Sequence, residues 1–136
     1  LFSGSTKHSS YALAMLEQTA ANSGAINDPA FASRYAALLL DVQDLGAGYR
    51  RFADIVKRGE TLPASVSWLK VWATETHERI SMELIDASTE RAVWLDDGLA
   101  ERLAPLYSAM AAKIFSGTNE VQRNILAKVV LDLPSA

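Results

Sequence analysis

The segment DPAFASRYAALLLDVQDLGAGYRRFADIV, residues 28–56, carries apolar side chains at alternating steps of four and three residues. The members of this series are Phe31, Tyr35, Leu38, Val42, Leu45, Tyr49, Phe52 and Val56. The spacing places all of them on one face of an α-helix of about seven turns. A repeat near 3.5 residues is typical of helices that pack against near-parallel neighbours. The segment therefore predicts a long helix in a helical bundle.

Both the start and the middle of this segment carry further signals. Asp28 can cap the helix, and Pro29 suits the first helical position because the N–H that it lacks would be unpaired there. Gly46 and Gly48 each cost about 1 kcal/mol relative to Ala inside a helix. We expect a close approach of a neighbouring helix at both glycines to explain them.

Four further segments show the same helical period, and Gly, Pro and polar residues separate them. They run from about residue 8 to 21, from Pro63 to Thr89, from Leu99 to Ile114, and from Ser116 to a stop before Pro134. The side chains expected to face the core are Leu13, Leu16 and Ala20; Val66, Leu69, Ala73, Thr76, Ile80 and Leu84; Leu99, Leu103, Leu106, Met110 and Ile114; and Val121, Ile125 and Val129. Pro105 should kink the fourth segment or delay its start. The predicted fold is all-α, an up-and-down four-helix bundle with a short additional C-terminal helix in a single domain, 1–136.

Composition excludes several classes of function. The chain has 136 residues, 49% of them apolar and 21% charged, with a net charge of -3 and no cysteine. The charge argues against a nucleic-acid partner, and the missing cysteines exclude disulfides and thiolate metal sites. No apolar run reaches the length of a membrane span, so we expect a cytoplasmic protein without a membrane partner. Because the chain begins at Leu1, we also expect a fragment of a longer protein.

Most titratable and aromatic residues have an ordinary structural interpretation. His8 and His77 lie in different segments without a second ligand at metal-binding spacing, so we interpret them as packing or surface residues. The charged residues of the third segment predict a solvent-exposed face with pairs at i,i+4; they are Lys70, Glu75, Glu78, Arg79 and Glu83. The aromatic side chains at helical spacing predict a core or a subunit interface; they are Tyr49, Phe52, Trp68 and Trp72.

The stretch FSGTNEVQRNILAK, residues 115–128, has a more specific character. Ser116 or Thr118 can cap the last helix, with Glu120 and Gln122 in its first turn. The Gly-Thr pair, the Glu-Val-Gln-Arg that follows it and the ending up to Pro134 resemble the C-terminal signature of acyl-CoA dehydrogenases. The resemblance spans the chain in helix order and is strongest from Phe115 to Leu133. It implies that the chain is the C-terminal helical bundle of an enzyme with two further domains.

The resemblance also implies a flavin cofactor and a reaction. In that family FAD accepts a hydride from an acyl-CoA thioester while a carboxylate removes a proton, which gives the 2-enoyl-CoA. Gly117, Thr118 and Glu120 match positions that contact the cofactor. Ser116 stands where many members have the catalytic Glu and cannot replace it, so we expect no catalytic residue in this chain and no activity of the chain alone.

Two further departures from the family pattern bear on the cofactor. Glu83, Asp86 and Ala87 stand where the family has a Gln and a Gly-Gly pair against the adenosine half of a neighbouring subunit's FAD. The family's pyrophosphate-binding Arg is replaced by the Gly24–Asp28 turn, which holds no cation. We therefore expect one of two tetramers, a heteromeric enzyme in which this subunit has an incomplete flavin site, or a homotetramer whose base precedes Leu1. The alternative from another class is a non-catalytic helical assembly module.

Overall fold

The computed structural model describes residues 6–89 and 98–134. In these ranges the chain forms helices and no strand, which confirms the all-α class. The helices are α1 (Lys7–Ser23), η1 (Ala25–Asn27), α2 (Pro29–Lys57), η2 (Ala64–Val66), α3 (Ser67–Thr89), α4 (Leu99–Ala112), α5 (Asn119–Ile125) and η4 (Leu126–Val130).

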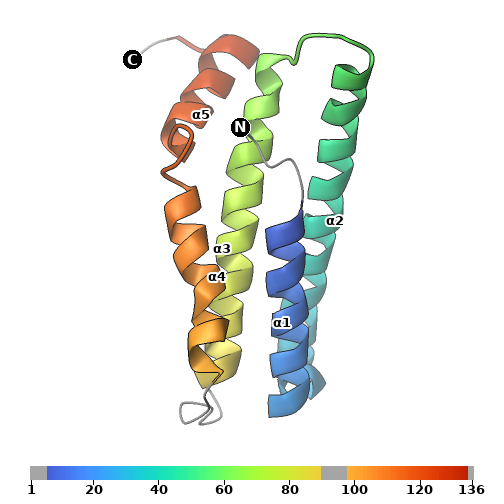
Figure 1. The fold of residues 1–136 in the computed structure, drawn as a ribbon, viewed down its shortest axis with the longest axis vertical. Coiled ribbons are helices and arrows are strands. Elements are labelled where there is room, and N and C mark those ends of the chain that lie inside the picture. The colour runs from blue at the N-terminus through green and yellow to red at the C-terminus, as the bar shows by residue number, and fades with distance from the viewer. Residues whose placement is uncertain (1–5, 90–97, 135–136) are drawn as a thin grey trace.

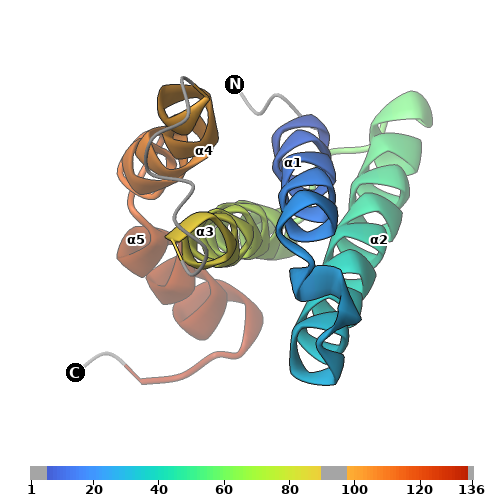
Figure 2. The ribbon, with the colours of Figure 1, turned by 90° about the horizontal axis from the view of Figure 1, so that it is seen from below.

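Helix α3 occupies the centre of the bundle. Figure 1 shows α1 and α2 on one side of α3 and α4 and α5 on the other, with α4 and α5 following one another along α3. The view along the bundle in Figure 2 shows the same arrangement, with α3 between the two pairs. Successive long helices run in opposite directions, which is the up-and-down order expected from the sequence. Because α3 contacts all four other α-helices, its two faces decide how the domain packs.

The start of α2 follows the local signals in the sequence. Gly24 ends α1 in the left-handed conformation, with φ of 76°. The Asp28 side chain accepts a hydrogen bond from the backbone N–H of Ala30 at 3.0 Å, and Pro29 occupies the first turn. The predicted cap is confirmed, so the entry into the longest helix is determined locally.

The apolar seam of α2 forms the core between α1, α2 and α3. Its inward members Phe31, Leu38 and Val42 are buried together with residues of α1 and α3. The residues that these two helices add to the cluster are Ala12, Leu13, Leu16, Ala20, Ile80, Leu84 and Ala87. The prediction was wrong at the end of the seam, because Val56 is 55% exposed. There α2 extends towards its C-terminus and leaves its last turn uncovered.

A second cluster, which contains the aromatic residues, joins the C-terminal half of α2 to α3. Leu45, Phe52 and Leu69 are buried, and Tyr49 and Trp68 pack against them. The core interpretation of these aromatic residues is confirmed, with Trp72 at its more exposed edge. Their rings meet edge to face or tilted, as aromatic pairs prefer, with centroids 5.3 Å apart for Trp68 and Trp72.

The two glycines of α2 differ in their surroundings. A Cβ atom on Gly48 would lie 2.5 Å from Trp68 and 2.9 Å from Leu69, so α3 approaches too closely for any side chain. A Cβ atom on Gly46 would meet nothing closer than 3.5 Å. The predicted close approach is confirmed at Gly48 and wrong at Gly46.

The face of α3 that points to α4 and α5 is buried although it is polar. Thr74, Ser81 and Ser88 are buried, and their hydroxyl groups donate to backbone carbonyls four residues earlier, at 2.9, 2.7 and 2.7 Å. Such bonds satisfy a buried hydroxyl without a partner on another helix. Because the residues of this face are polar, the sequence did not indicate that α3 is covered on both sides.

The expected inward faces of α4 and of the last segment were wrong in part, since Leu103, Leu106 and Ile125 are half-buried but the other described members are exposed. Met110 and Ile114 are 55% and 67% exposed, and the buried residues of α4 are Pro105 and Ala109. Pro105 lies inside the helix and does not delay its start. The side chain of Leu99 lies outside the described residues.

The end of the chain differs from the single helix expected. Val121 and Val129 are exposed, and the buried residue of α5 is the polar Asn119. After Ile125 the backbone widens into the five-residue π-helix η4. Apolar side chains therefore remain exposed in this part of the chain, and we refer to them together as the C-terminal apolar surface: Tyr107, Met110, Ile114, Phe115, Val121, Val129, Val130, Leu131 and Leu133.

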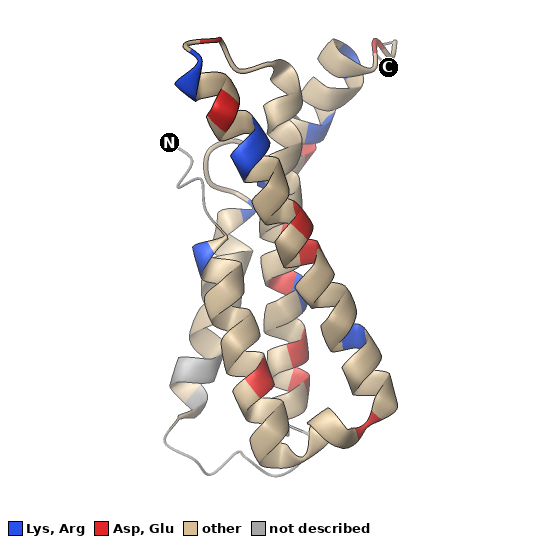
Figure 3. Cartoon of the chain, turned by 90° about the vertical axis from the view of Figure 1, so that its right-hand side faces the viewer, with Lys and Arg blue, Asp and Glu red and all other residues tan. Residues whose placement is uncertain are grey.

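Charges are mixed over the part of the chain that the structure describes. In the view of Figure 3, basic and acidic residues alternate along the bundle instead of forming a basic stripe. Neither this distribution nor the net charge of -3 supports nucleic-acid binding. Of the helices in the described ranges, none combines the length and the apolar character that a membrane span requires.

His77 is a buried histidine at the contact of α3 with α1 and α4. It is 6% exposed, its Nε2 atom lies 3.1 Å from Ser108 Oγ, and its ring centroid lies 6.2 Å from that of His8. Its buried Nδ1 atom has no hydrogen-bond partner among the residues that the structure describes. Burial, followed by the charge of His8, lowers the pKa of His77 below its usual value of 6.5, although the Pro105 carbonyl opposes this shift. The packing interpretation of His77 is confirmed.

We expect Gly48→Ala to lower the free energy of unfolding by about 1 to 3 kcal/mol, because the new methyl group overlaps Trp68 and Leu69. Gly46→Ala is the matched control, where added helix propensity should raise stability by up to about 1 kcal/mol. Urea denaturation of both variants measures the difference. Equal effects of the two substitutions would contradict the close contact at Gly48.

We expect the free energy of unfolding to fall as the pH drops below about 6.5, because the unfolded chain then binds a proton that the folded state, with its lowered His77 pKa, does not. Above that pH, His77 is neutral in both the folded and the unfolded state, and its contribution to the free energy of unfolding no longer changes with pH. Urea denaturation between about pH 7.5 and 5.5 should show a smaller slope for His77→Gln than for the parent. His8→Gln should remove only the smaller contribution to the lowered His77 pKa, the one that comes from the charge of His8. An unchanged slope in His77→Gln would assign the pH dependence to other groups.

Candidate functional site

The turn between α4 and α5 has an unusual backbone. Ser116 and Gly117 both have positive φ, at 59° and 85°. The left-handed region costs a non-glycine residue about 1 kcal/mol, so Ser116 holds a strained conformation that its surroundings must maintain. A Cβ atom on Gly117 would also lie 2.9 Å from Gln122 Nε2. Both residues are exposed, so the turn presents its backbone at the surface.

Thr118 ends the turn and starts the next helix. Its hydroxyl accepts a hydrogen bond from the backbone N–H of Val121 at 3.3 Å, so of the two caps considered the structure chooses Thr118. Glu120 follows in the first turn and is exposed. Its own backbone N–H, and then the Thr118 hydroxyl, lower the pKa of the Glu120 carboxyl, so this residue stays ionised at neutral pH.

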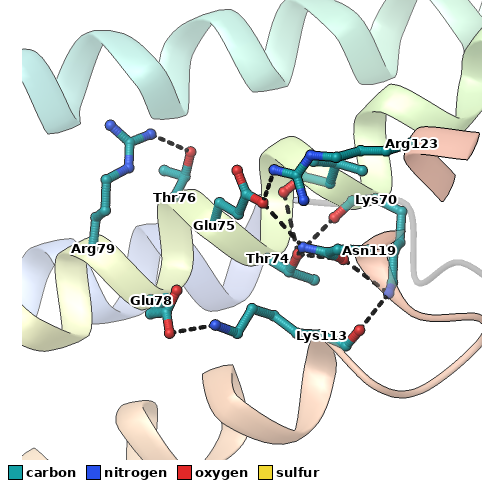
Figure 4. Close-up of polar contacts among 10 residues, drawn as sticks. Lys70, Thr74, Glu75, Thr76, Glu78, Arg79, Lys113, Asn119 and Arg123 are labelled. Carbon is teal, nitrogen blue, oxygen red and sulfur yellow. Dashed lines mark hydrogen bonds and ion pairs between the residues drawn. The ribbon is translucent and has the colours of Figure 1, made fainter. Parts of the chain in front are cut away.

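Beneath the turn lies the ammonium group of Lys70. This side chain belongs to α3 and is 5% exposed. Its Nζ donates to the carbonyl of Lys113 at 3.0 Å, to the carbonyl of Gly117 at 2.5 Å and to the Asn119 side-chain oxygen at 3.0 Å. Figure 4 shows Lys70 reaching from α3 towards Asn119 and Lys113. Burial lowers the pKa of Lys70, and the charge of Glu120 partly opposes that shift.

Asn119 extends this arrangement into a buried polar network. Its amide nitrogen donates to Thr74 Oγ1 at 2.9 Å and to Glu75 Oε1 at 3.3 Å. Glu75 is also bound by Arg123 of α5. The network therefore fastens the first residues of α5 to the N-terminal half of α3, as Figure 4 shows.

The prediction of a solvent-exposed charged face on α3 was wrong. Lys70 is buried, and the other charged residues of this face pair with neighbouring helices instead of with each other along α3. The bridges are Glu75–Arg123, Glu78–Lys113 at 2.6 Å, Arg79–Asp41 at 2.8 Å and Glu83–Arg34 at 2.9 Å. Partners distant in sequence could not be read from the spacing within one helix. No sequence signal marked Lys70, and for Asn119 the only hint was its position next to Thr118.

Ser116 has no chemistry of its own in this position. It is an exposed hydroxyl, and such a group becomes a base or nucleophile only beside a general base. The buried histidine His77 lies instead at Ser108, between α3 and α4. Groups of three or more His, Cys, Asp or Glu able to hold a metal ion are absent from the ranges that the structure describes.

The other expected cofactor residues lie elsewhere on α3. Glu83, Asp86 and Ala87 are near its C-terminal end, about 20 to 26 Å along the helix from Lys70 at 1.5 Å per residue. One chain therefore does not bring them to the Gly117–Thr118 turn. A cavity of about 60 Å³ is present at this end, lined by Ala25, Asp28, Phe31, Arg34, Glu83, Asp86 and Ala87.

This cavity does not fit an anionic pyrophosphate. Arg34 is a cation near the position where the sequence suggested none, but it makes two hydrogen bonds to Glu83, at 2.9 and 3.2 Å. Asp28 and Asp86 add further carboxylates to the lining. The cavity is also far smaller than the roughly 300 Å³ or more of ordinary ligand sites. In the Gly117–Thr118 turn, by contrast, Gly117 is exposed and Thr118 is half-buried.

We expect Gly117→Ala to lower the free energy of unfolding by about 1 kcal/mol or more, because Ala strains at positive φ and its methyl group meets Gln122. Ser116→Gly, in the same turn, should not destabilise the protein, since Gly accepts the conformation that Ser116 already has. Thermal or urea denaturation compares the two variants. A loss in Ser116→Gly as large as that in Gly117→Ala would contradict the turn geometry.

Comparison with known proteins agrees with this geometry. Residues 9–131 match the family model described as "Acyl-CoA dehydrogenase, C-terminal domain". No curated protein and no solved structure gives a significant match to the chain. The matched residues include all the long helices, the Lys70 network and the Gly117–Thr118 turn. The chain therefore belongs to the acyl-CoA dehydrogenase family, in which it corresponds to the C-terminal helical domain.

Proposed function

We propose that this domain, residues 1–136, is part of a FAD-dependent acyl-CoA dehydrogenase that oxidises an acyl-CoA thioester to the 2-enoyl-CoA. The observation that carries the proposal is the family match across residues 9–131, together with the exposed, tightly held turn at Ser116–Thr118. The domain would contribute this turn to the flavin site and its uncovered apolar surface to contacts with the rest of the enzyme.

The bound FAD would supply hydride acceptance, the chemistry that side chains alone do not provide. Within this chain, Gly117 allows the backbone to approach a ring closely because it has no side chain. Thr118 holds the start of α5 through its hydrogen bond to Val121, and Glu120 keeps a negative charge in the first turn. These residues position the cofactor and do not react.

The proton of the acyl-CoA thioester would be removed by a carboxylate other than that of Glu120. Ser116 occupies the position of the usual base, and its hydroxyl is too weak a base without a neighbouring His or carboxylate. We therefore place the base upstream of Leu1 or on another subunit. The domain alone would then neither retain FAD nor turn over substrate.

The C-terminal apolar surface supports an assembled enzyme. It combines exposed side chains of α4, such as Met110, with those of the turn and of η4, such as Phe115 and Val129. Exposed apolar side chains that form a patch mark sites of protein contact. We propose that the other domains of the enzyme and neighbouring subunits cover it in a cytoplasmic homo- or heterotetramer, a dimer of dimers.

A non-catalytic assembly subunit is the second candidate. The observation that favours it is the acidic cavity at Glu83, Asp86 and Ala87, which does not fit the pyrophosphate of a neighbouring flavin. In that case a different subunit type would bind the cofactor, and this chain would contribute its helices to the assembly. The same cavity is compatible with a homotetramer only if FAD is held by other domains.

The full-length gene product, purified in its native state with whatever copurifies, tests the proposal. We expect an absorption spectrum of bound flavin and, by native mass spectrometry, a tetramer that reduces the flavin when an acyl-CoA is added. Thr118→Val should weaken flavin retention, and Thr118→Ser, which keeps the hydroxyl, is the matched control.

The other outcomes separate the candidates. Flavin carried by a second, different chain, with no flavin on this one, would favour the assembly subunit. Complete absence of flavin from both the protein and its copurifying partners would contradict the proposed dehydrogenase function.

A further inference from the structure

Lys70 is an ammonium group buried among neutral acceptors. The three groups that it contacts are the carbonyls of Lys113 and Gly117 and the amide oxygen of Asn119. Removing an ammonium group from water costs free energy, and a well-packed apolar residue of similar size is often at least as stabilising. An apolar residue would avoid that cost but would leave the three acceptors without the donor that they have now, so the acceptors must be considered as well.

The positions of its acceptors give a more specific explanation. Lys113 lies directly after α4, Gly117 lies in the turn, and Asn119 is the first residue of α5. One cation thus binds the chain before, within and after the left-handed pair Ser116–Gly117. Hydrogen bonds from an ionised donor are shorter and stronger than those between neutral groups, so the three together restrict the turn to one conformation.

A second contact secures the same segment to α3. The side chain of Lys113 binds Glu78 at 2.6 Å, while its carbonyl accepts from Lys70. Thr74 and Glu75 hold the other side of the Asn119 amide. These contacts hold the turn in place against α3, the most enclosed element of the domain. The outer surface of the turn is nevertheless exposed.

We propose that Lys70 is the positioning residue of the Ser116–Thr118 turn and determines how that turn meets the cofactor. The inference rests on the proposed function for the cofactor contact, but the positioning itself concerns residues of this chain only. Lys70 does not touch the reacting atoms and takes no part in proton transfer.

Hydrogen exchange in the full-length protein tests the positioning directly. The backbone N–H of Asn119 is bound to the carbonyl of Lys113 at 3.2 Å, and that of Val121 to Thr118. We expect Lys70→Met to speed exchange at these two amides at least tenfold, with little change in the middle of α3. Lys128→Met, which removes an exposed lysine of the nearby η4, is the matched control and should change neither.

Two further variants keep the test decisive. Lys70→Arg retains a charged donor and should restore much of the protection. Asn119→Ala removes one acceptor but leaves the ammonium group, so a smaller increase at the same amides is expected even if Lys70→Met fails to fold. Unchanged exchange in Asn119→Ala and Lys70→Met, or an increase spread equally over the whole bundle, would overturn the positioning role.

The flavin dissociation constant, measured on the same variants, separates this inference from the proposed function. A rise of tenfold or more in Lys70→Met, reversed in Lys70→Arg, supports both. Faster exchange of the turn with an unchanged flavin dissociation constant would leave Lys70 as the residue that orders the turn but overturn its effect on the cofactor. It would also contradict the contact proposed between the turn and the flavin.

Discussion

The contact of the Lys70 ammonium group with the α4–α5 turn is the constraint on which the rest of this domain depends. It fixes the point at which the chain leaves α4, passes through two left-handed residues and starts α5. A charged donor was needed because neutral hydrogen bonds would hold three acceptors less firmly in a turn that is strained. The cost of burying that charge explains why Asn119, Thr74 and Glu75 form a continuous network around it.

Two features at opposite ends of α3 bear differently on the cofactor. Near the start of α3, the Gly117–Thr118 turn is held by the buried Lys70 network, and Gly117 is exposed. Near its end, Arg34 is engaged by Glu83, and Asp86 adds negative charge. The two ends would serve different flavins in an assembly, since about 20 to 26 Å of helix separates them. The proposal of unequal subunits rests on this contrast between an exposed turn at one end of α3 and an acidic cavity at the other.

The packing of the bundle leaves its two halves in different environments. On the side of α1 and α2 an apolar seam is enclosed by three helices, and Gly48 lets α2 approach Trp68. On the other side, α4 buries Pro105 and Ala109 but exposes Met110, and Ile114, just after α4, is exposed as well. A helix whose larger apolar residues point outward is stable in a larger assembly, where a partner covers them. The C-terminal apolar surface is thus part of the function proposed for the domain.

The sequence by itself determined the long helices, the cap at Asp28, the seam of α2 as far as Phe52 and the family. These features depend on hydrogen bonds and spacings within a few turns of helix, which periodicity and capping residues record directly. The tertiary structure alone decided that α3 is covered on both faces, that Lys70 and Asn119 are buried, and that Met110, Ile114 and Val121 are exposed. The acceptors of Lys70 lie 43, 47 and 49 residues away in the chain, so no local pattern could reveal them. Whether a polar residue is buried depends on partners that only the folded chain brings together.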